Sequence, residues 1–498
     1  MRAHERVRAS GATRRGASCD ASDPVRDPKT ISVATDALAR SDREPDESLA
    51  LVVAWCADEP HRLGEIALFA DRGRAQTLGR GDGDGEARVR FFRQRPTRLA
   101  ATRPFEGLAL SRRQLVVEAR GGKLAVERVG RAAMLINGVA AEKGMLVPGD
   151  TLLLRGQLLL SCTRRAPSIP KPGFFEETSF GAFGEVDAVG ILGESPIVWR
   201  TRERIAFAAH AGKHLLLHGE SGTGKELAAR AVHALSPRAK RSFVSRNAAT
   251  LPQGLIDAEL FGNAKNYPNA GMTERGGLVG EADGGTLFLD EIAELPHEQQ
   301  SHLLRVLDAD GEYQRLGEST TRRSDFILVA ATNRDLDSLK GDVAARFTLR
   351  VELPPLEARR EDIPLLARHL LLLAAKSSPK VGERFLREGD DGRIDPRIDP
   401  ELVEDLLVRE YETNVRELEA LLWRAMAGSH GDTVVFTDEL RKESRGRAVE
   451  PSAGDVRAAI ARADGSVQKA ARALGMKSRF ALYRLMKKHG IEADGERE

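Results

Sequence analysis

The 498-residue sequence has few cysteines, little net charge and no long apolar run, and each of these absences argues against a class of protein. Its three cysteines, Cys19, Cys56 and Cys162, are widely spaced and belong to no CxxC or histidine cluster. This argues against a disulfide framework or a zinc site and favours a reducing compartment. No stretch approaches the ~18 consecutive apolar residues of a membrane span, and the N-terminus lacks an apolar signal core. We therefore expect a cytoplasmic protein with no membrane partner.

The formal net charge is only +2, so any attraction to nucleic acid must come from a local cluster of basic residues. The chain length suits about three domains. Changes in composition predict the following segments: a disordered leader 1–47, an all-β sandwich 48–165, a Pro-rich linker 166–186, an α/β core 187–356, a helical lid 357–440, a polar linker 441–454 and a helical domain 455–498.

Two kinds of apolar pattern distinguish the first two folded segments. Short β-rich runs separated by turns such as Gly121-Gly122 and Asn137-Gly138 are typical of an all-β sandwich or barrel. Continuous apolar runs are typical instead of strands buried on both faces of a parallel sheet. Such runs occur at 214–217, 286–289 and 326–331, and helical periodicity follows at 363–375 and 415–427.

A glycine-rich segment follows the first continuous run and opens a predicted helix at Glu226–Leu235. Glycines allow backbone N–H groups to turn toward phosphates, the helix N-terminus favours negative charge, and a lysine can reach the β- and γ-phosphates. The segment predicts an ATP site formed by Gly219, Glu220, Ser221, Gly222, Thr223, Gly224, Lys225 and Glu226. Glu226 stands where Ser or Thr usually contacts Mg²⁺, so we expect only indirect metal contact there.

The second run ends in two acids, Asp290 and Glu291. In P-loop enzymes the first acid holds Mg²⁺, and an adjacent acid can orient and polarise the attacking water. We therefore assign Asp290 to the metal and Glu291 to catalysis, and we expect ATP hydrolysis. Such a pair alone would more often be a solvated strand end, but here it follows a phosphate-binding loop and precedes a third run that ends in Thr332-Asn333.

These residues resemble the AAA+ domain of the sigma-54-dependent activators over roughly residues 187–440. The segments that carry the resemblance also include Gly193-Glu194-Ser195, Glu259-Leu260-Phe261-Gly262, Gly285–Leu289, Ala331–Arg334 and Asn414–Leu418. The resemblance implies that Asn333 and Arg416 are sensors, that Asn247 restrains the catalytic glutamate, and that Arg346 is an arginine finger, with Lys340 in place of a second one. It also implies a homo-oligomeric ring, a hexamer, that acts on RNA polymerase.

One loop departs from the pattern of that family. Family members carry Gly-Ala-Phe-Thr-Gly-Ala after the Phe-Gly pair and grip the sigma factor with it, whereas residues 266–271 here read Asn-Tyr-Pro-Asn-Ala-Gly. Proline fixes φ and the phenylalanine is missing. This predicts that the protein stimulates sigma-54 promoters weakly or not at all. It would act instead through another polymerase form or partner. The alternative is a conventional activator in which Tyr267 replaces the apolar tip.

The C-terminal segment resembles a Fis-type helix-turn-helix with predicted helices at 456–463, 467–474 and 478–489. Its last two helices are rich in basic residues that no acid opposes, so DNA is the expected partner. The expected DNA contacts are Lys477, Ser478, Arg479, Phe480, Tyr483, Arg484 and Lys487. The alternative is an AAA+ remodeller whose tail binds a protein.

The β-rich segment resembles forkhead-associated domains, which bind phosphothreonine peptides. Leu78-Gly79-Arg80 and Ser111-Arg112 match two loops of that family. The resemblance implies phosphopeptide contacts from Arg80, Ser111 and Arg112. Because Gln114 replaces the usual histidine, the alternative is a degenerate domain that serves only in assembly.

Overall fold

The computed structural model describes residues 47–70, 73–81, 87–308, 311–389, 392–446, 453–463, 466–474, 476, 482–483, 485–486 and 491. The predicted leader lies almost wholly outside these residues. Six of the seven predicted DNA contacts also lie outside them, namely Lys477, Ser478, Arg479, Phe480, Arg484 and Lys487. Among the described residues, no helix is long and apolar enough to cross a membrane.

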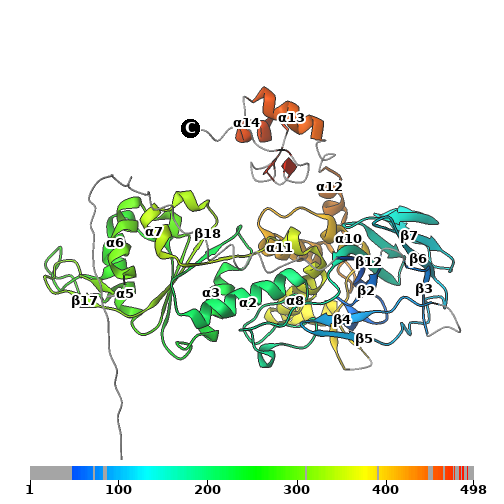
Figure 1. Cartoon of the computed structure of the whole chain (residues 1–498), viewed down its shortest axis with the longest axis horizontal. Coiled ribbons are helices and arrows are strands. Elements are labelled where there is room, and N and C mark those ends of the chain that lie inside the picture. Colours follow the sequence, from blue (N-terminus) through cyan, green and yellow to red (C-terminus); the bar gives the residue numbers. More distant parts are fainter. Residues whose placement is uncertain are drawn as a thin grey trace, which may run out of the picture. The chain divides into compact units, whose positions relative to one another are not determined.

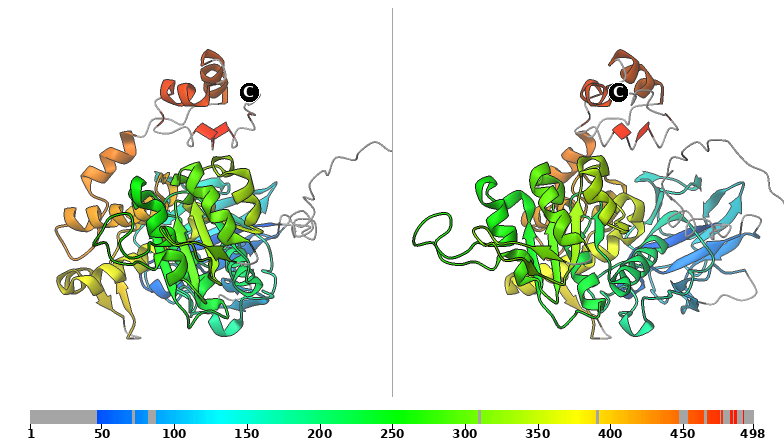
Figure 2. Two further views of the ribbon diagram at one scale, coloured as in Figure 1. Left: turned by 90° about the vertical axis from the view of Figure 1, so that its left-hand side faces the viewer. Right: turned by 60° about the vertical axis from the view of Figure 1, so that its left-hand side comes forward.

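Two antiparallel sheets pack face to face between Ser48 and Arg165, and their strands are coloured blue to cyan in Figures 1 and 2. The larger sheet has the order β5-β4-β2-β1-β12-β11-β8-β9, and the smaller has the order β10-β7-β6-β3. The strands are β1 (Ser48–Cys56), β2 (Ile66–Phe69), β3 (Gln76–Leu78), β4 (Phe92–Arg95), β5 (Arg98–Ala101), β6 (Leu115–Arg120), β7 (Lys123–Arg128), β8 (Met134–Ile136), β9 (Val139–Ala140), β10 (Lys143–Leu146), β11 (Thr151–Leu154) and β12 (Leu158–Arg165).

Local turn chemistry sets the hairpins of these sheets. Gly121 and Gly122 join β6 to β7, and Asn137 and Gly138 join β8 to β9; all four residues have positive φ, as a two-residue hairpin turn between right-twisted strands requires. The larger sheet is apolar on both faces. Leu152 and Leu154 of β11 face the smaller sheet, whereas Leu153 joins the core of the helical lid.

The α/β core contains a five-stranded parallel sheet of order β14-β15-β18-β13-β19. Helices α2 and α3 cover one face, and α4 to α7 cover the other (Figure 1). The three continuous apolar runs form β13, β15 and β18, whose side chains alternate between these two layers. The elements are α2 (Pro196–Ala211), β13 (Leu215–His218), α3 (Lys225–Leu235), β14 (Phe243–Asn247), α4 (Ile256–Phe261), α5 (Gly277–Glu281), β15 (Thr286–Asp290), α6 (His297–Leu307), β16 (Glu312–Tyr313), β17 (Arg322–Arg323), β18 (Ile327–Thr332), α7 (Gly341–Arg346) and β19 (Leu349–Glu352).

The helical lid extends further than its predicted end. It consists of α8 (Ile363–Ser377), α9 (Pro379–Phe385), β20 (Leu386–Glu388), β21 (Ile394–Pro396), α10 (Pro400–Val408), α11 (Asn414–Gly428) and α12 (Asp438–Gly446). The prediction of a linker at 441–454 is therefore wrong in its first part. Polar composition predicted a tether, but Arg441 donates to Glu401 at 2.6 Å and Ser444 donates to Asp405 at 2.6 Å, so these polar side chains hold α12 on the lid.

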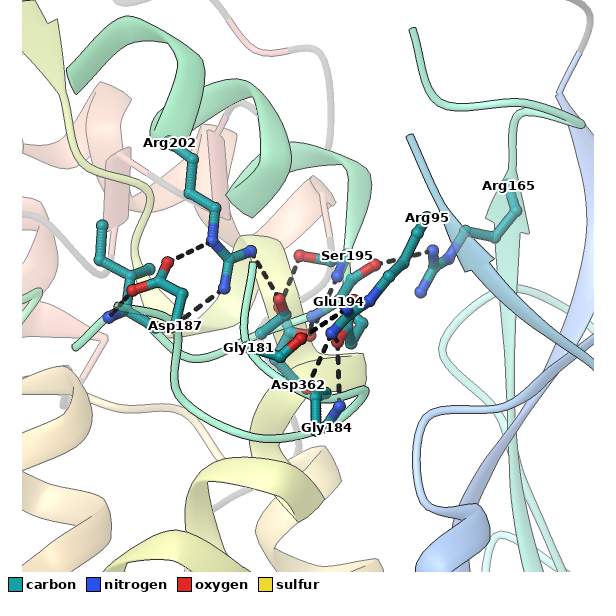
Figure 3. Close-up of polar contacts among 12 residues, drawn as sticks. Arg95, Arg165, Gly181, Gly184, Asp187, Glu194, Ser195, Arg202 and Asp362 are labelled. Atoms are coloured by element: carbon teal, nitrogen blue, oxygen red, sulfur yellow. Dashed lines mark hydrogen bonds and ion pairs between the residues drawn. The ribbon is translucent and has the colours of Figure 1, made fainter. Parts of the chain in front are cut away.

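Two arginines of the β sandwich reach the Gly193-Glu194-Ser195 turn of the α/β core (Figure 3). Arg95 donates through Nη2 to Glu194 Oε1 at 2.5 Å. Arg165 is buried and donates to the Glu194 carbonyl oxygen at 3.2 Å and to Glu361 Oε2 at 2.9 Å. The same turn is tied to the start of α8, because Ser195 Oγ donates to Asp362 Oδ2 at 2.5 Å. The sandwich thus contacts the junction between core and lid.

The C-terminal segment has a small core of its own. Helices α13 (Ala453–Arg462) and α14 (Val467–Ala473) pack through Val456, Ala459 and Ala470. Leu482, Leu485 and Met486 belong to the same cluster, and each of these positions is helical. Ser466 caps α14 by accepting from the Lys469 N–H.

Candidate active site

The glycine-rich loop between β13 and α3 is closed against the lid. Gly222 has φ +76°, and a Cβ there would lie 2.0 Å from the carbonyl oxygen of Thr413. Gly224 has φ +99° and faces open space within 4 Å. The loop therefore requires glycine once for close approach to the lid and once more for its left-handed backbone.

Lys225 lies inside this loop. Its Nζ donates to the carbonyl oxygens of Gly219 and Glu220 at 3.0 and 3.1 Å. Burial lowers the pKa of Lys225, and the nearby carboxylates of Glu291 and Asp290 oppose that shift. The Lys225 ammonium group therefore interacts both with the glycine-rich loop and with the carboxylates of Asp290 and Glu291.

The two acids lie at the end of β15, where Asp290 is the last residue of the strand and Glu291 follows it. Asp290 Oδ1 accepts from the Glu291 N–H at 3.0 Å, and Glu291 itself has the left-handed φ of +51°. Burial raises the pKa of Glu291; Lys225 lowers it, and Asp290 raises it further. The backbone N–H of Asn333 also donates to Glu291, so the ends of β15 and β18 meet here. A raised pKa makes the carboxylate a better proton acceptor.

Two lid residues, Arg416 and Asn414, contact the glycine-rich loop. Arg416 donates through Nη1 to Ser221 Oγ at 3.2 Å. Asn414, buried and at φ +50°, donates through Nδ2 to the Ser221 carbonyl oxygen at 3.0 Å, and its Oδ1 accepts from Leu356 N–H at 2.6 Å. Asn414 was not among the predicted site residues. Its place two residues before Arg416 was the available signal.

The arrangement fits a magnesium nucleotide. A helix N-terminus and a lysine face the carboxylates at the ends of parallel strands, where α/β proteins bind ligands. Asp290 would hold Mg²⁺, which neutralises phosphate charge when bound. Glu226 instead forms an ion pair of 2.8 Å with Arg230 on the exposed face of α3.

Comparison with known proteins identifies the family. Residues 191–354 match the Sigma-54 interaction domain. The chain is also 35% identical over 314 residues to the transcriptional regulatory protein ZraR of Salmonella typhimurium, an alignment that covers 59% of this chain and 68% of ZraR. The chain belongs to the sigma-54-dependent activators of the AAA+ family.

Other members of the sigma-54-dependent activators match over shorter parts. The Nif-specific regulatory protein of Bradyrhizobium diazoefficiens is 38% identical over 261 residues, which are 51% of this chain and 42% of that protein. NtrC of Klebsiella pneumoniae, a DNA-binding transcriptional regulator, is 45% identical over 193 residues, 37% of this chain and 41% of NtrC. The chain therefore spans less than half the length of these two relatives. The structure of NtrX from Brucella abortus in complex with ATP is 30% identical, covers 63% of this chain and 71% of NtrX, and has a TM-score of 0.43.

The sigma-54 activator resemblance also implied roles for Asn247, Arg346 and Lys340, of which Asn247 lies beside Asp290. Asn247 pairs in register with Asp290, and its Oδ1 accepts from Ala249 N–H at 2.9 Å. Arg346, at the end of α7, pairs with Asp308 at 2.8 Å and has a side chain 49% exposed. Lys340 donates to Ser301 Oγ at 2.8 Å. The roles of Asn247, Arg346 and Lys340 stay predictions.

The loop that departs from the sigma-54 activator pattern is held by Asn263. This buried amide lies within hydrogen-bond distance of the carbonyl oxygens of Ala264, Tyr267 and Thr273. Tyr267 is 42% exposed, and its ring lies over Gly317, where a Cβ would be only 2.5 Å from the ring. Tyr267 is thus the large apolar side chain exposed in this loop.

The three predicted phosphopeptide contacts lie together on the β sandwich. Arg80 N–H donates to the Ser111 carbonyl oxygen at 3.1 Å, and Arg112 and Ser111 carbonyls leave no room for a Cβ on Gly79. Gln114 is buried and donates through Nε2 to the Ala132 carbonyl oxygen at 3.2 Å. Phosphopeptide binding by these loops stays a prediction. Among the predicted DNA contacts the structure describes Tyr483, which is 39% exposed.

Lys225→Ala is expected to weaken ATP binding by about tenfold to a hundredfold, because a charge-assisted hydrogen bond contributes ~1.5–3 kcal/mol. Fluorescent ATP titration measures this. Lys213→Ala removes the same charge from an exposed residue just before β13 and should bind ATP normally. If the two variants bound ATP with equal affinity, the nucleotide site would have to lie elsewhere.

Proposed function

We propose that this chain is a cytoplasmic, ATP-hydrolysing, DNA-binding regulator of transcription. The observation that carries the proposal is the placement of Lys225 against Asp290 and Glu291 beneath a lid that carries Arg416. Glu291 orients and deprotonates the attacking water, while Lys225 and Arg416 bind the phosphates. ATP bound at the glycine-rich loop contacts both the core and the lid. Its hydrolysis can therefore change the position of the lid relative to the core.

The proposed active form is a homo-oligomeric ring. Arg346 lies on an exposed helix end and is bound within the chain only to the half-exposed Asp308 among the described residues. A guanidinium of this kind can turn to the γ-phosphate held by a neighbouring subunit, where it stabilises the charge of the transition state. The neighbour in the ring would thereby complete each site.

We further propose that coupling to sigma-54 is weak. The loop at 266–271 lacks the phenylalanine of the family motif, and Tyr267 rests on Gly317. A partner such as sigma-54 responds to ATP only if its contacts with the loop differ between the nucleotide states. An altered loop changes those contacts without changing the ATP site.

DNA binding is assigned to the segment after Ser452. Truncation there removes α13 and α14 but keeps α12, which Leu440 and Ser444 hold on the lid. A DNA duplex that the full chain binds is first selected from a pool of random sequences. The same duplex is then titrated into the truncated chain. The truncated chain should bind it at least about a hundredfold more weakly and hydrolyse ATP normally. An unchanged DNA affinity of the truncated chain would show that the DNA site lies outside the tail, and would favour a tail that binds a protein.

A further inference from the structure

A pocket rich in arginine lies on the β sandwich beside β4 and β5. It has a volume of about 530 Å³, within the ~300–1,000 Å³ range of small-molecule sites. Five arginines and two glutamates line it together with His61, Ala100, Ala101, Thr102 and Phe183. Arg80, Ser111 and Arg112 are not among the lining residues, so this pocket is separate from the predicted phosphopeptide loops.

Both acids of the pocket are already occupied. Glu65 is buried and accepts from Arg62 at 2.7 Å and from Arg93 at 3.1 Å. Glu59 pairs with Arg62 at 3.2 Å and also accepts from the backbone N–H of Glu106 at 2.8 Å. Neither carboxylate is therefore available to neutralise a further arginine.

Two arginines of the pocket remain uncompensated. Arg98 begins β5 and Arg103 follows its end, and both are exposed. Throughout the part of the chain that the structure describes, neither guanidinium has a hydrogen-bond or ion-pair partner. Two guanidinium groups without partners at one concave surface offer hydrogen-bond donors to two negative groups, because arginine binds phosphate through paired hydrogen bonds.

The floor of the pocket is fixed in place. Arg93 and Arg95 both lie over the ring of Phe183, and their guanidinium carbons are 5.3 and 5.6 Å from its centroid. Arg95 is held in turn by Glu194 and by the Gly181 carbonyl oxygen at 2.7 Å (Figure 3). Arg93 and Arg95 are therefore positioned before any ligand arrives, whereas the exposed side chains of Arg98 and Arg103 become ordered on binding.

We infer that this pocket binds a small molecule carrying two phosphate groups or a pyrophosphate, with Arg98 and Arg103 as its principal contacts. The inference does not depend on the proposed function. Its position has a consequence for the rest of the chain: Arg95 lines the pocket and also binds Glu194, in the turn that Ser195 ties to the start of the lid. A ligand here lies one side chain away from the junction of core and lid.

Calorimetric titration with pyrophosphate tests the inference. The full chain with Lys225→Ala is used throughout, so that binding at the ATP loop is suppressed. Addition of Arg98→Ala and Arg103→Ala should weaken pyrophosphate binding by at least about tenfold. The matched control adds Arg200→Ala and Arg204→Ala, which remove two exposed arginines of α2 outside the pocket and should change affinity by less than about twofold. Thermal melting of all three proteins checks that each is folded.

Three results would overturn the inference. They are no pyrophosphate binding to the Lys225→Ala chain, equal losses in the two double variants, and unchanged binding after removal of Arg98 and Arg103. Sulfate provides a further arm because it carries one doubly charged group. It should bind at least about tenfold more weakly than pyrophosphate, since it can satisfy only one guanidinium pair. Equal binding of sulfate would contradict the assignment of two phosphate groups.

Discussion

Replacing Glu291 by glutamine is expected to lower ATP turnover by about 10²–10⁴-fold, the usual contribution of a positioned general base. The carboxylate lies at the end of β15 beside Lys225, and burial raises its pKa, so it is suited to accept a proton from water. Glutamine keeps the shape of the side chain but cannot accept that proton. Since Lys225 and the glycine-rich loop are unchanged, ATP affinity should stay within about twofold.

Glu294→Gln is the matched control. Glu294 lies three residues further along and forms an ion pair with Arg334. Phosphate release and nucleotide titration are measured on both variants and on the parent chain. Parental turnover in Glu291→Gln, or an equal loss in Glu294→Gln, would show that another group activates the water.

Much of the architecture could be predicted because local chemistry determined it. The Gly121-Gly122 and Asn137-Gly138 pairs adopt the positive φ values that a tight hairpin needs, so the sequence alone located those turns. The apolar runs of β13, β15 and β18 were equally informative, since a parallel sheet covered on both faces needs apolar residues at every position. The glycine-rich loop and the two acids follow from those strands.

Features that depend on long-range packing could not be predicted. The polar sequence after Leu440 resembles a linker, and it continues as a helix because its polar side chains pair with acids of α10 and with Arg424 of α11. Asn414 contacts Glu220 of the glycine-rich loop because the lid brings it there, across 194 residues of sequence. The contact of Arg165 with Glu361 likewise joins distant segments, and an arginine at the end of a strand gives no sign of being buried.

The loop at 266–271 is expected to uncouple ATP hydrolysis from sigma-54 polymerase. In this chain Asn263 holds the loop through three carbonyl oxygens, and Pro268 stands where the family has phenylalanine. The exposed aromatic group is Tyr267, which lies against Gly317. A different side chain in a differently shaped loop should make little contact with the sigma factor, although Lys225 and Glu291 are intact.

Restoring the family motif should therefore restore coupling. A variant with Gly-Ala-Phe-Thr-Gly-Ala in place of residues 266–271 keeps every residue of the ATP site. It should open a sigma-54 promoter in an ATP-dependent manner, and addition of Glu291→Gln should abolish that activity. The same variant should hydrolyse ATP at a rate within about twofold of the parent, because the loop contributes no group to the Lys225 site.

ATP-dependent open-complex formation by purified sigma-54 RNA polymerase shows whether the 266–271 loop couples ATP hydrolysis to that polymerase. Permanganate reactivity of the promoter is compared for the parent chain, the restored-loop variant and Tyr267→Ala. We expect ATP hydrolysis by all three proteins and promoter opening by the restored-loop variant alone. Strong opening by the parent chain that disappears in Tyr267→Ala would contradict this expectation, and would identify Tyr267 as the residue that contacts the sigma factor.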